Sequence, residues 1–270
     1  MIPKKSLGQH FLSDPNILGG IVDALDPAPG EIVIEIGPGR GDLTRLLALR
    51  GARVIGIEKD RRLVAELEGS GIGDSGLVRI VEGDALELGW HALLPIPNPA
   101  SPLPSFSVVG NIPYYITSPL LEKALTPPLP SRIVFLVQKE VADRIVAAPG
   151  SKTYGALSVG IQAACRVERL FTVKAGAFRP PPKVDSAVIR LTPRAEPVIP
   201  VEQGRAFRKF VVACFGQRRK QLRNVLALVL GREPGAVAEA LRELGFDPAT
   251  RPERLSPQDF ARLLIWSRQL

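Results

Sequence analysis

The sequence predicts an α/β protein with two domains, in which a largely parallel sheet covered by helices precedes a smaller helical unit. Apolar strand patterns alternate with helical patterns from about residue 31 to 147, and strand patterns at 164–173 and 186–191 would complete the sheet. Residues 193–200 form a proline-rich linker, after which the apolar spacing is helical only. We therefore predict a first domain over residues 1–193 and a helical domain over residues 201–270.

The first predicted strand, residues 31–36, runs into a glycine-rich loop with the pattern Gly-x-Gly-x-Gly at Gly37, Gly39 and Gly41. Glycines let a backbone approach a ligand closely, and a helix that begins near Asp42 points its amides at the loop. The dinucleotide fingerprint has two residues before its last glycine, so this loop departs from it. The pattern predicts a nucleotide-binding turn.

Acidic residues follow the next two predicted strands. Glu58 ends the strand 53–57, about twenty residues after the glycine loop, where a carboxylate can accept hydrogen bonds from both ribose hydroxyls. Asp84 follows the strand 78–81 and would meet the amino group of an adenine. Taken singly, each is more often a solvated carboxylate or a helix cap. Because they occur at successive strand ends, they favour an adenosine-type ligand.

A further strand pattern, residues 106–110, ends in Asn111, Ile112, Pro113 and Tyr114. The Asn111 side-chain oxygen and the Ile112 carbonyl can accept the two hydrogens of an exocyclic amino group, and Tyr114 offers a flat face to the ring that carries it. Adenine is the natural candidate. The alternative is an ordinary turn after a strand, because Asn and Pro are common turn residues.

The segment after residue 200 carries its apolar residues at helical spacing. The pattern predicts helices around residues 207–214 and 222–229. Two more helices are expected over residues 235–244 and 257–270, the second with Ser256 as its N-cap.

The glycine loop, the acidic residue Glu58 and the Asn-Pro-aromatic motif follow one another in the order found in S-adenosylmethionine-dependent methyltransferases. The chain therefore resembles this class of enzymes. Residues 4–12 (KKSLGQHFL) and 178–186 (FRPPPKVDS) are similar to signatures of the rRNA adenine N6,N6-dimethyltransferases. Residues 178–186 and 217–224 (QRRKQLRN) resemble the small-subunit enzymes, the kasugamycin-sensitivity methyltransferases, more than the large-subunit macrolide-resistance methylases. His10 stands where many members carry Asn, and Ile112 where many carry Leu.

The resemblance implies a Rossmann-like S-adenosylmethionine-dependent methyltransferase domain with a small C-terminal helical domain. It implies methyl transfer to N6 of two adjacent adenosines in the 3′-terminal hairpin of small-subunit (16S) rRNA, giving N6,N6-dimethyladenosines within an immature 30S subunit. Asn111, Ile112, Pro113 and Tyr114 would be catalytic, with Phe178 as the second aromatic that stacks on the base. The residues implied to bind S-adenosylmethionine are Gln9, His10, Leu12, Glu35, Gly37, Gly39, Gly41, Glu58, Lys59, Asp84, Ala85 and Asn111.

The charge of the chain fits a nucleic-acid partner, because its formal net charge is +8. Basic residues also cluster between positions 205 and 223 without an intervening acidic residue. The residues expected to contact RNA are Lys4, Lys5, Arg218, Arg219, Lys220 and Arg223. The alternative is a solvated helical face that carries charge for solubility.

Several kinds of site are not expected. Cys165 and Cys214 are isolated, and His91 has no partner motif, so no metal site is predicted. No apolar run approaches the length needed to span a bilayer, and no apolar signal core is expected at the N-terminus. We expect a cytoplasmic monomer that needs neither a metal nor a membrane.

Three other functions are compatible with parts of the pattern. A dinucleotide-dependent oxidoreductase would use the same loop and Glu58, but would leave residues 111–114 unexplained. A non-catalytic RNA-binding assembly factor could keep the fold, although its motif residues would not need to be intact. A large-subunit rRNA adenine methylase would share the chemistry and differ only in the RNA that accepts the methyl group.

Overall fold

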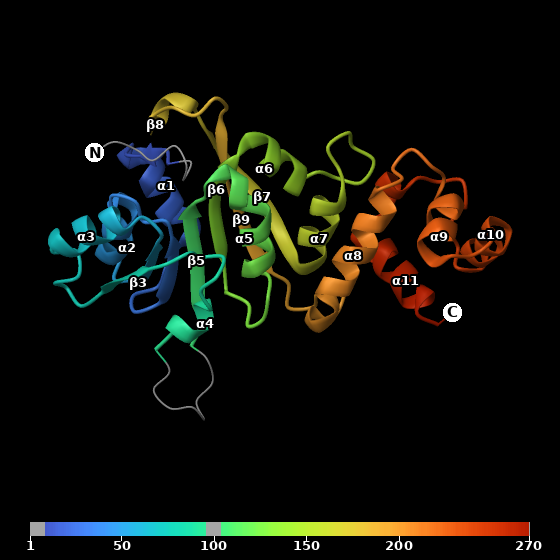
Figure 1. Cartoon of the computed structure of the whole chain (residues 1–270), viewed down its shortest axis with the longest axis horizontal. Helices are drawn as coiled ribbons and strands as arrows, with labels where there is room; N and C mark the ends of the chain where they lie inside the picture. The colour runs from blue at the N-terminus through green and yellow to red at the C-terminus, as the bar shows by residue number, and fades with distance from the viewer. Residues whose placement is uncertain (1–8, 96–103, 270) are drawn as a thin grey trace. The chain divides into compact units, whose positions relative to one another are not determined.

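The computed structural model describes residues 9–95 and 104–269 and confirms the predicted α/β class. A seven-stranded sheet has the order β4-β3-β2-β5-β6-β9-β7 (Figure 1). The pairs among β2 to β6 are parallel, and β9 is antiparallel to β6. The strands are β2 (Ile32–Ile36), β3 (Arg53–Glu58), β4 (Val78–Glu82), β5 (Phe106–Asn111), β6 (Ile133–Gln138), β7 (Cys165–Val173) and β9 (Ser186–Pro193).

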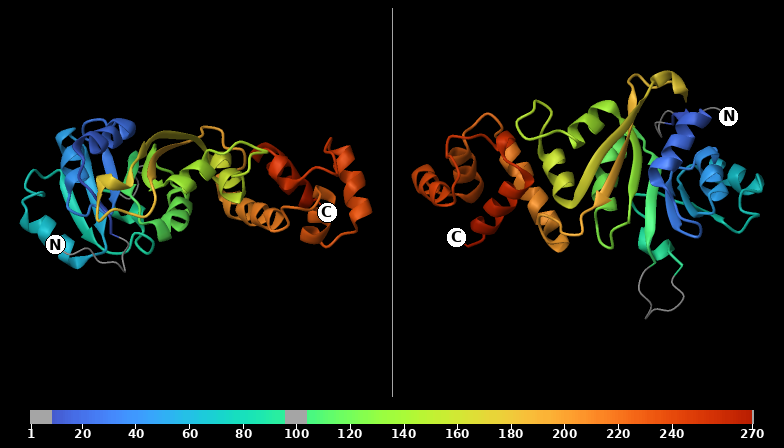
Figure 2. Two further views of the ribbon diagram at one scale, coloured as in Figure 1. Left: turned by 90° about the horizontal axis from the view of Figure 1, so that it is seen from above. Right: turned by 180° about the vertical axis from the view of Figure 1, so that it is seen from behind.

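Helices cover both faces of the sheet. The strand order runs in opposite directions on the two sides of β2, so right-handed crossovers bring the helices between β2, β3 and β4 to one face and the helix between β5 and β6 to the other (Figure 2). The α-helices along residues 15–145 are α1 (Pro15–Leu25), α2 (Asp42–Leu49), α3 (Arg61–Gly69), α4 (Trp90–Leu93), α5 (Thr117–Ala124) and α6 (Lys139–Ile145). Buried side chains of α1 and α2 share one apolar cluster with the sheet, which fixes the first face.

A second, two-stranded sheet joins two segments that are far apart in the sequence. Strand β1 (Phe11–Leu12) pairs antiparallel with β8 (Phe178–Arg179), so that Leu12 lies opposite Phe178. Among residues 9–95 and 104–269, short 3₁₀ helices are η2 (Tyr114–Ile116), η3 (Ala175–Ala177), η4 (Val201–Gln203) and η5 (Pro252–Arg254). The two signature segments recognised in the sequence thus meet as neighbouring strands.

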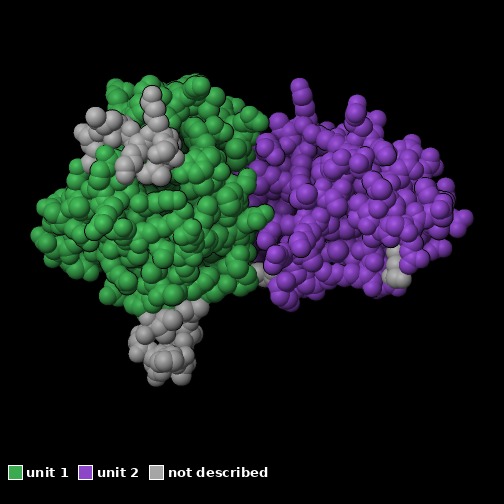
Figure 3. Space-filling model, in the orientation of Figure 1, with its two compact units in different colours: residues 1–142, 168–193 green, residues 143–167, 194–270 purple. Residues whose placement is uncertain are grey.

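The chain divides into two compact units, residues 1–142 with 168–193 and residues 143–167 with 194–270 (Figure 3). The sequence placed residues 143–167 in the first domain, because strand and helix patterns alternate there as in the sheet. In the structure, Tyr154 and Val159 from that segment are buried in the apolar core of the second unit. The second unit holds α7 (Ala156–Ala164), α8 (Gly204–Phe215), α9 (Leu222–Leu230), α10 (Pro234–Glu243) and α11 (Pro257–Ser267).

The helix boundaries of the second unit follow local signals. Ser256 caps α11 as predicted, since its side chain accepts a hydrogen bond from the Asp259 amide. Across residues 9–95 and 104–269, no helix is both long enough and apolar enough to cross a membrane.

One carboxyl group is buried within the sheet. Glu35 in β2 is 2% exposed, and its Oε2 accepts a hydrogen bond of 2.6 Å from the Thr44 hydroxyl of α2. Burial, with smaller contributions from the charges of Glu58 and Asp42, raises the pKa of Glu35 to about 7. The folded protein therefore favours the protonated form of Glu35 below about pH 7.

The first prediction concerns Gly110, the last glycine before the Asn-Pro-aromatic motif. A Cβ there would lie 2.7 Å from the Ile36 carbonyl oxygen of the neighbouring strand, so Gly110→Ala should lower the free energy of unfolding by about 1–3 kcal/mol. Gly19 in α1 is the matched control, because its Cβ would meet no atom within 4 Å. Gly19→Ala should stabilise the helix by about 0.5–1 kcal/mol. Equal urea midpoints for the two variants would contradict the close approach of β5 to β2.

The second prediction uses the buried carboxyl group. A pKa raised from 4.5 to about 7 means that the stability contributed by protonated Glu35 is present below pH 4.5 and is lost as the pH rises through 7. The loss amounts to about 3 kcal/mol at 1.36 kcal/mol per pKa unit. Glu35→Gln stays neutral, so its stability relative to the wild type should rise between pH 4.5 and pH 8 in urea unfolding.

Glu66→Gln, on the exposed side of α3, is the matched control and should show no such trend. A stability difference between Glu35→Gln and the wild type that is independent of pH would mean that Glu35 is ionised in the folded protein throughout this range.

Candidate functional site

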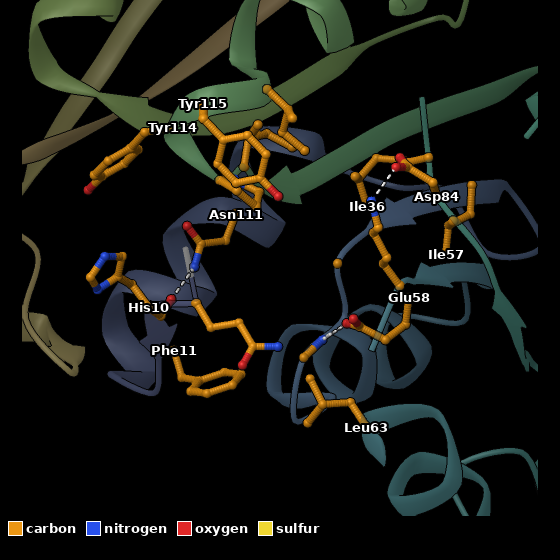
Figure 4. A pocket seen from close by; sticks show the side chains of 18 of the residues that line it. His10, Phe11, Ile36, Ile57, Glu58, Leu63, Asp84, Asn111, Tyr114 and Tyr115 are labelled. Carbon is orange, nitrogen blue, oxygen red and sulfur yellow. Dashed lines mark hydrogen bonds and ion pairs between the residues drawn. The ribbon is translucent and has the colours of Figure 1, made fainter. Parts of the chain in front are cut away.

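A pocket opens at the carboxyl ends of the parallel strands, where α/β folds build ligand sites (Figure 4). The glycine loop, the ends of β3, β4 and β5, and the segment before β1 all contribute to its wall. The predicted site residues that line it are Gln9, His10, Gly37, Gly39, Glu58, Lys59, Asp84, Ala85, Asn111, Ile112, Pro113 and Tyr114. The structure therefore brings most of the residues chosen from the sequence into one hollow.

The glycine loop forms one wall of this pocket. Gly37 has a φ of +70°, and a Cβ placed on it would meet no protein atom within 4 Å. Because Gly37 lines the pocket, that Cβ would occupy space left for a ligand. Glycine is needed there for both its backbone conformation and its lack of a side chain.

Glu58 ties the glycine loop to the end of β3. One of its carboxylate oxygens accepts a hydrogen bond of 3.1 Å from the Gly39 amide, and the other accepts one of 2.8 Å from the Asp60 amide. Burial raises the pKa of Glu58, although these amide hydrogen bonds oppose the shift. Each oxygen keeps a further lone pair, so the carboxylate can still accept hydrogen bonds from a ligand.

Asp84 is held in place by a neighbouring cation. Its Oδ2 lies 2.6 Å from the Lys59 ammonium, and its Oδ1 accepts a hydrogen bond of 2.8 Å from the Leu86 amide. The hydrogen bond from Lys59 is the largest cause of the lowered pKa of Asp84. The pocket therefore presents an ionised carboxylate beside Lys59 at the end of β4.

Asn111 at the end of β5 has a defined orientation. Its Nδ2 donates a hydrogen bond of 2.8 Å to the backbone carbonyl of His10. The side-chain oxygen therefore faces the other way, toward the rings of Tyr114 and His10 (Figure 4). The adjoining amide of Ile112 donates to the Leu136 carbonyl at 3.1 Å, which fixes the backbone of the motif against β6.

The rings of Tyr114 and His10 lie one above the other beside the Asn111 side chain (Figure 4). The Tyr114 hydroxyl is 2.9 Å from the Ser186 hydroxyl, and burial raises the pKa of Tyr114. The His10 Nδ1 donates to the Pro180 carbonyl at 2.8 Å. The two ring centroids are 6.0 Å apart with 25° between the planes.

Phe178 was predicted to stack on the base, and the structure places it outside the pocket wall. Its side chain is 1% exposed and packs in the apolar cluster with Leu12 and Leu18. Its strand pairs with β1, and its stacking role stays a prediction. A single aromatic next to prolines gave no indication of which side it would face.

Three residues predicted to bind the cofactor lie outside the main pocket. Leu12 and Glu35 line a smaller adjoining hollow that shares Gly37, Gly39 and Asn111 with it. Gly41 lines neither hollow and is the N-cap of α2, where a Cβ would lie 2.7 Å from Leu67. Gly41 therefore serves the packing of the loop.

Sequence reasoning missed several wall residues, most of them apolar neighbours of those it chose. They are Phe11, Ile36, Ile57, Leu63, Gly83, Tyr115 and Ile116. Only their positions in the sequence could have indicated a place in the wall, because most of them lie next to the polar residues at the strand ends. Tyr115 is 60% exposed and was passed over in favour of Tyr114.

The basic cluster of the second unit includes one residue, Arg218, that is paired within the unit. The Arg218 Nε donates to Glu253 at 2.7 Å, and its guanidinium also donates to the Lys152 carbonyl at 2.8 Å. Arg218 is thus part of the packing of this unit, and its acidic partner lies too far along the sequence to be anticipated. Arg219 and Lys220 are exposed, and Arg223 is partly exposed. Lys4 and Lys5 lie outside the described residues.

Within the described ranges, no group of three or more His, Cys, Asp or Glu side chains is arranged to hold a metal ion. Cys165 and Cys214 are buried, and burial raises the pKa of each thiol to about 12, so neither is a reactive thiolate. His91 donates from Nε2 to the Pro128 carbonyl at 2.8 Å, which is a structural contact.

Known proteins are similar to this chain in sequence and in fold. The family model described as ribosomal RNA adenine dimethylase matches residues 3–269. The ribosomal RNA small subunit methyltransferase A of Xanthomonas campestris pv. campestris (strain B100) is 45% identical over 262 residues, which cover 96% of this chain and 94% of the relative. Two solved structures are also similar.

A dimethyladenosine transferase from Plasmodium falciparum has a TM-score of 0.79 at 26% identity and covers 96% of this chain and 98% of that one. The 23S rRNA methyltransferase ErmE has a TM-score of 0.71 at 29% identity, with 96% and 100% covered. The family match extends over both compact units. The chain therefore belongs to the ribosomal RNA adenine dimethylase family.

Proposed function

We propose that this protein transfers methyl groups from S-adenosylmethionine to N6 of two adjacent adenosines in the 3′-terminal hairpin of small-subunit (16S) rRNA. The observation that carries the proposal is the orientation of Asn111. Its amide donates to the His10 carbonyl, so its oxygen faces the pocket beside Tyr114 as an acceptor for an amino group. Family membership supplies the reaction class.

The chain has suitable residues for the cofactor. The space beside Gly37 admits a ligand against the backbone, the Glu58 carboxylate suits ribose hydroxyls, and the Asp84 carboxylate suits an adenine amino group. When bound, S-adenosylmethionine supplies an electrophilic methyl group on a sulfonium. Gln9, Lys59 and the backbone near Ala85 would complete the binding site.

The lone pair of adenine N6 is delocalised into the ring, which makes the nitrogen a poor nucleophile. Hydrogen bonds from N6 to the Asn111 oxygen and the Ile112 carbonyl favour a pyramidal nitrogen with a localised lone pair. The same oxygens stabilise the positive charge that N6 gains during attack. A preorganised group of this kind contributes about 2.7–4 kcal/mol in comparable sites. Because these hydrogen bonds position N6 and localise its lone pair, the reaction needs no strong base.

Tyr114 would hold the target base in the pocket. Presenting N6 requires the base to leave its stack, which costs a few kcal/mol. Stacking on an aromatic ring stabilises the unstacked base by about 1–3 kcal/mol, which offsets this cost. The contact of the Tyr114 hydroxyl with Ser186 keeps the ring in a fixed position. The Tyr114 side chain therefore loses little conformational entropy when a base binds.

The similarities favour small-subunit rRNA over large-subunit rRNA as the substrate. The relative at 45% identity is named as a small subunit methyltransferase, whereas the 23S rRNA methyltransferase ErmE is 29% identical. We extend the proposal to an immature 30S subunit as the physiological substrate and to a monomer that acts in the cytoplasm. An oxidoreductase would leave the Asn111 orientation without a role, and an assembly factor without activity would not need it.

The test is transfer of labelled methyl groups to immature small subunits, with large-subunit rRNA as a parallel substrate. The wild type should form dimethyladenosine in small-subunit rRNA only, as nucleoside analysis would detect. Asn111→Ala should lower the rate by about 10²–10³-fold, because one preorganised oxygen is lost. Its affinity for the subunit should stay within about twofold, since Asn111 contributes no charge to phosphate binding.

Three results would contradict this assignment. Label in large-subunit RNA alone would make the protein a methylase of that subunit. No label in either RNA, with binding intact, would favour a non-catalytic assembly factor. An Asn111→Ala variant with full activity would remove the proposed mechanism.

A further prediction concerns the RNA-binding role of the second unit. Replacing Arg219, Lys220 and Arg223 with Gln should weaken subunit binding and reduce the slope of log affinity against log salt by about 2–3, at 0.7–0.9 per phosphate contact. Arg218 is left in place, because its loss would leave Glu253 without its partner.

The matched control removes three positive charges from the first unit. Arg50, Arg53 and Arg79 are exposed, and they lie away from the pocket wall. Arg50 pairs with Asp23, whose side chain is 66% exposed, so its loss, unlike that of Arg218, leaves a carboxylate that water can solvate. Their replacement with Gln should leave the salt slope unchanged. Equal slopes for the two triple variants would mean that residues 219–223 do not contact the RNA.

A further inference from the structure

We propose that Lys123 is a positioning residue for S-adenosylmethionine, which holds in place the turn that presents Asp84 to the adenine of the cofactor. Lys123 lies in α5 and does not line the pocket, so it would act through the turn and not through a contact with the cofactor. The inference rests on the proposed function, because it takes the Asp84 carboxylate as the acceptor for the adenine amino group.

The turn that carries Asp84 spans residues 83–89, between β4 and α4. The Gly83 amide continues the ladder with β3 by donating to the Glu58 carbonyl at 2.9 Å, and the residues after it have left the sheet. Inside the turn, the amides of Glu87 and Leu88 donate to the Asp84 carbonyl at 2.9 Å. These bonds fix the shape of the turn, whereas its position beside the pocket depends on contacts with neighbouring elements.

Two side chains donate hydrogen bonds to carbonyl groups of this turn. The Trp90 Nε1 donates to the Ala85 carbonyl at 2.8 Å, and the Lys123 ammonium donates to the Leu86 carbonyl at 2.7 Å. The ammonium also lies 5.7 Å from the centroid of the Trp90 ring, which is within the range of a cation–π attraction. Because these donors come from α4 and α5, two helices hold the turn from outside.

Leu86 connects Lys123 to Asp84. Its carbonyl accepts the hydrogen bond from Lys123, and its amide donates to Asp84 Oδ1 at 2.8 Å. The hydrogen bond from Lys59 is the largest cause of the lowered pKa of Asp84, and the positive charge of Lys123 contributes to the same shift. Lys123 therefore acts on this carboxylate through geometry and through charge.

The place of Lys123 in the fold also connects the two sides of the pocket. Helix α5 begins at Thr117, directly after η2, which contains Tyr114. Lys123 lies in the last turn of the same helix and reaches the turn after β4. The helix that continues from the proposed target-base motif thus also holds the segment proposed to face the cofactor's adenine.

Two substitutions at position 123 test the hydrogen bond from the ammonium. Lys123→Met keeps the unbranched apolar stem but removes the donor. Lys123→Arg keeps a cationic donor for the Leu86 carbonyl. Lys152→Met is the matched control, because Lys152 is an exposed lysine of the second unit. Asp84→Ala gives the signal expected when the proposed acceptor itself is lost.

The experiment measures calorimetric binding of two ligands in the absence of RNA. One is S-adenosylhomocysteine, the product form of the cofactor, and the other is its analogue in which hydrogen replaces the adenine amino group. The wild type should bind S-adenosylhomocysteine about 10-fold to 100-fold more tightly than the analogue, the value of one hydrogen bond to a charged group. Asp84→Ala should lose this preference.

Lys123→Met should bind S-adenosylhomocysteine about 5-fold to 10-fold more weakly than the wild type, because the carboxylate is no longer held toward the amino group. Its affinity for the analogue should stay within about twofold, which also shows that the variant is folded. Lys123→Arg and Lys152→Met should match the wild type within about twofold with both ligands. In methyl transfer to small subunits, Lys123→Met should raise the KM for S-adenosylmethionine by the same factor and leave kcat within about twofold.

An equal loss of affinity for both ligands in Lys123→Met would overturn the inference, because the effect would not involve the adenine amino group. Unchanged affinity of this variant for S-adenosylhomocysteine would also overturn it, and so would a wild type that does not distinguish the two ligands. Absence of methyl transfer by the wild type, with the binding results as expected, would refute the proposed function alone, since the binding measurements use no RNA.

Discussion

The hydrogen bond from the Asn111 amide to the His10 carbonyl is the contact on which the rest of the site depends. The two ends of an Asn side chain have almost the same shape, and only a fixed partner decides which end faces a ligand. His10 supplies that partner because the adjoining strand β1 is anchored on β8. Pairing between two distant segments thus decides that an acceptor, and not a donor, of the Asn111 side chain faces the pocket.

Each of the two carboxylates in the pocket wall has a hydrogen-bond or ion-pair partner within the protein. Glu58 is held by the amides of Gly39 and Asp60, and Asp84 by Lys59 and the Leu86 amide. Buried carboxylates need such partners, since an unpaired charge in a low-dielectric site is costly. The same contacts fix the glycine loop to β3 and the end of β3 to the end of β4, so this wall of the pocket is held by hydrogen bonds and an ion pair within the protein.

Much of the site could be predicted because its residues follow strands directly. Parallel strands end at one edge of the sheet, so Gly37, Glu58, Asp84 and Asn111 had to converge once the strands were recognised. The directions of side chains could not be predicted in the same way. Phe178 packs in the core, and Arg218 pairs with Glu253, a partner with which it shares no local sequence pattern.

The sequence by itself determined the fold class, the strand ends that carry the polar residues and the family, because periodicity and short motifs are local properties. Only the tertiary structure decided that residues 143–167 pack with the second unit, that the His10 carbonyl orients Asn111, and that the rings of His10 and Tyr114 lie near each other at the pocket. These outcomes depend on contacts between segments far apart in the chain. The direction of a side chain is set by such contacts, and no local pattern carries that information.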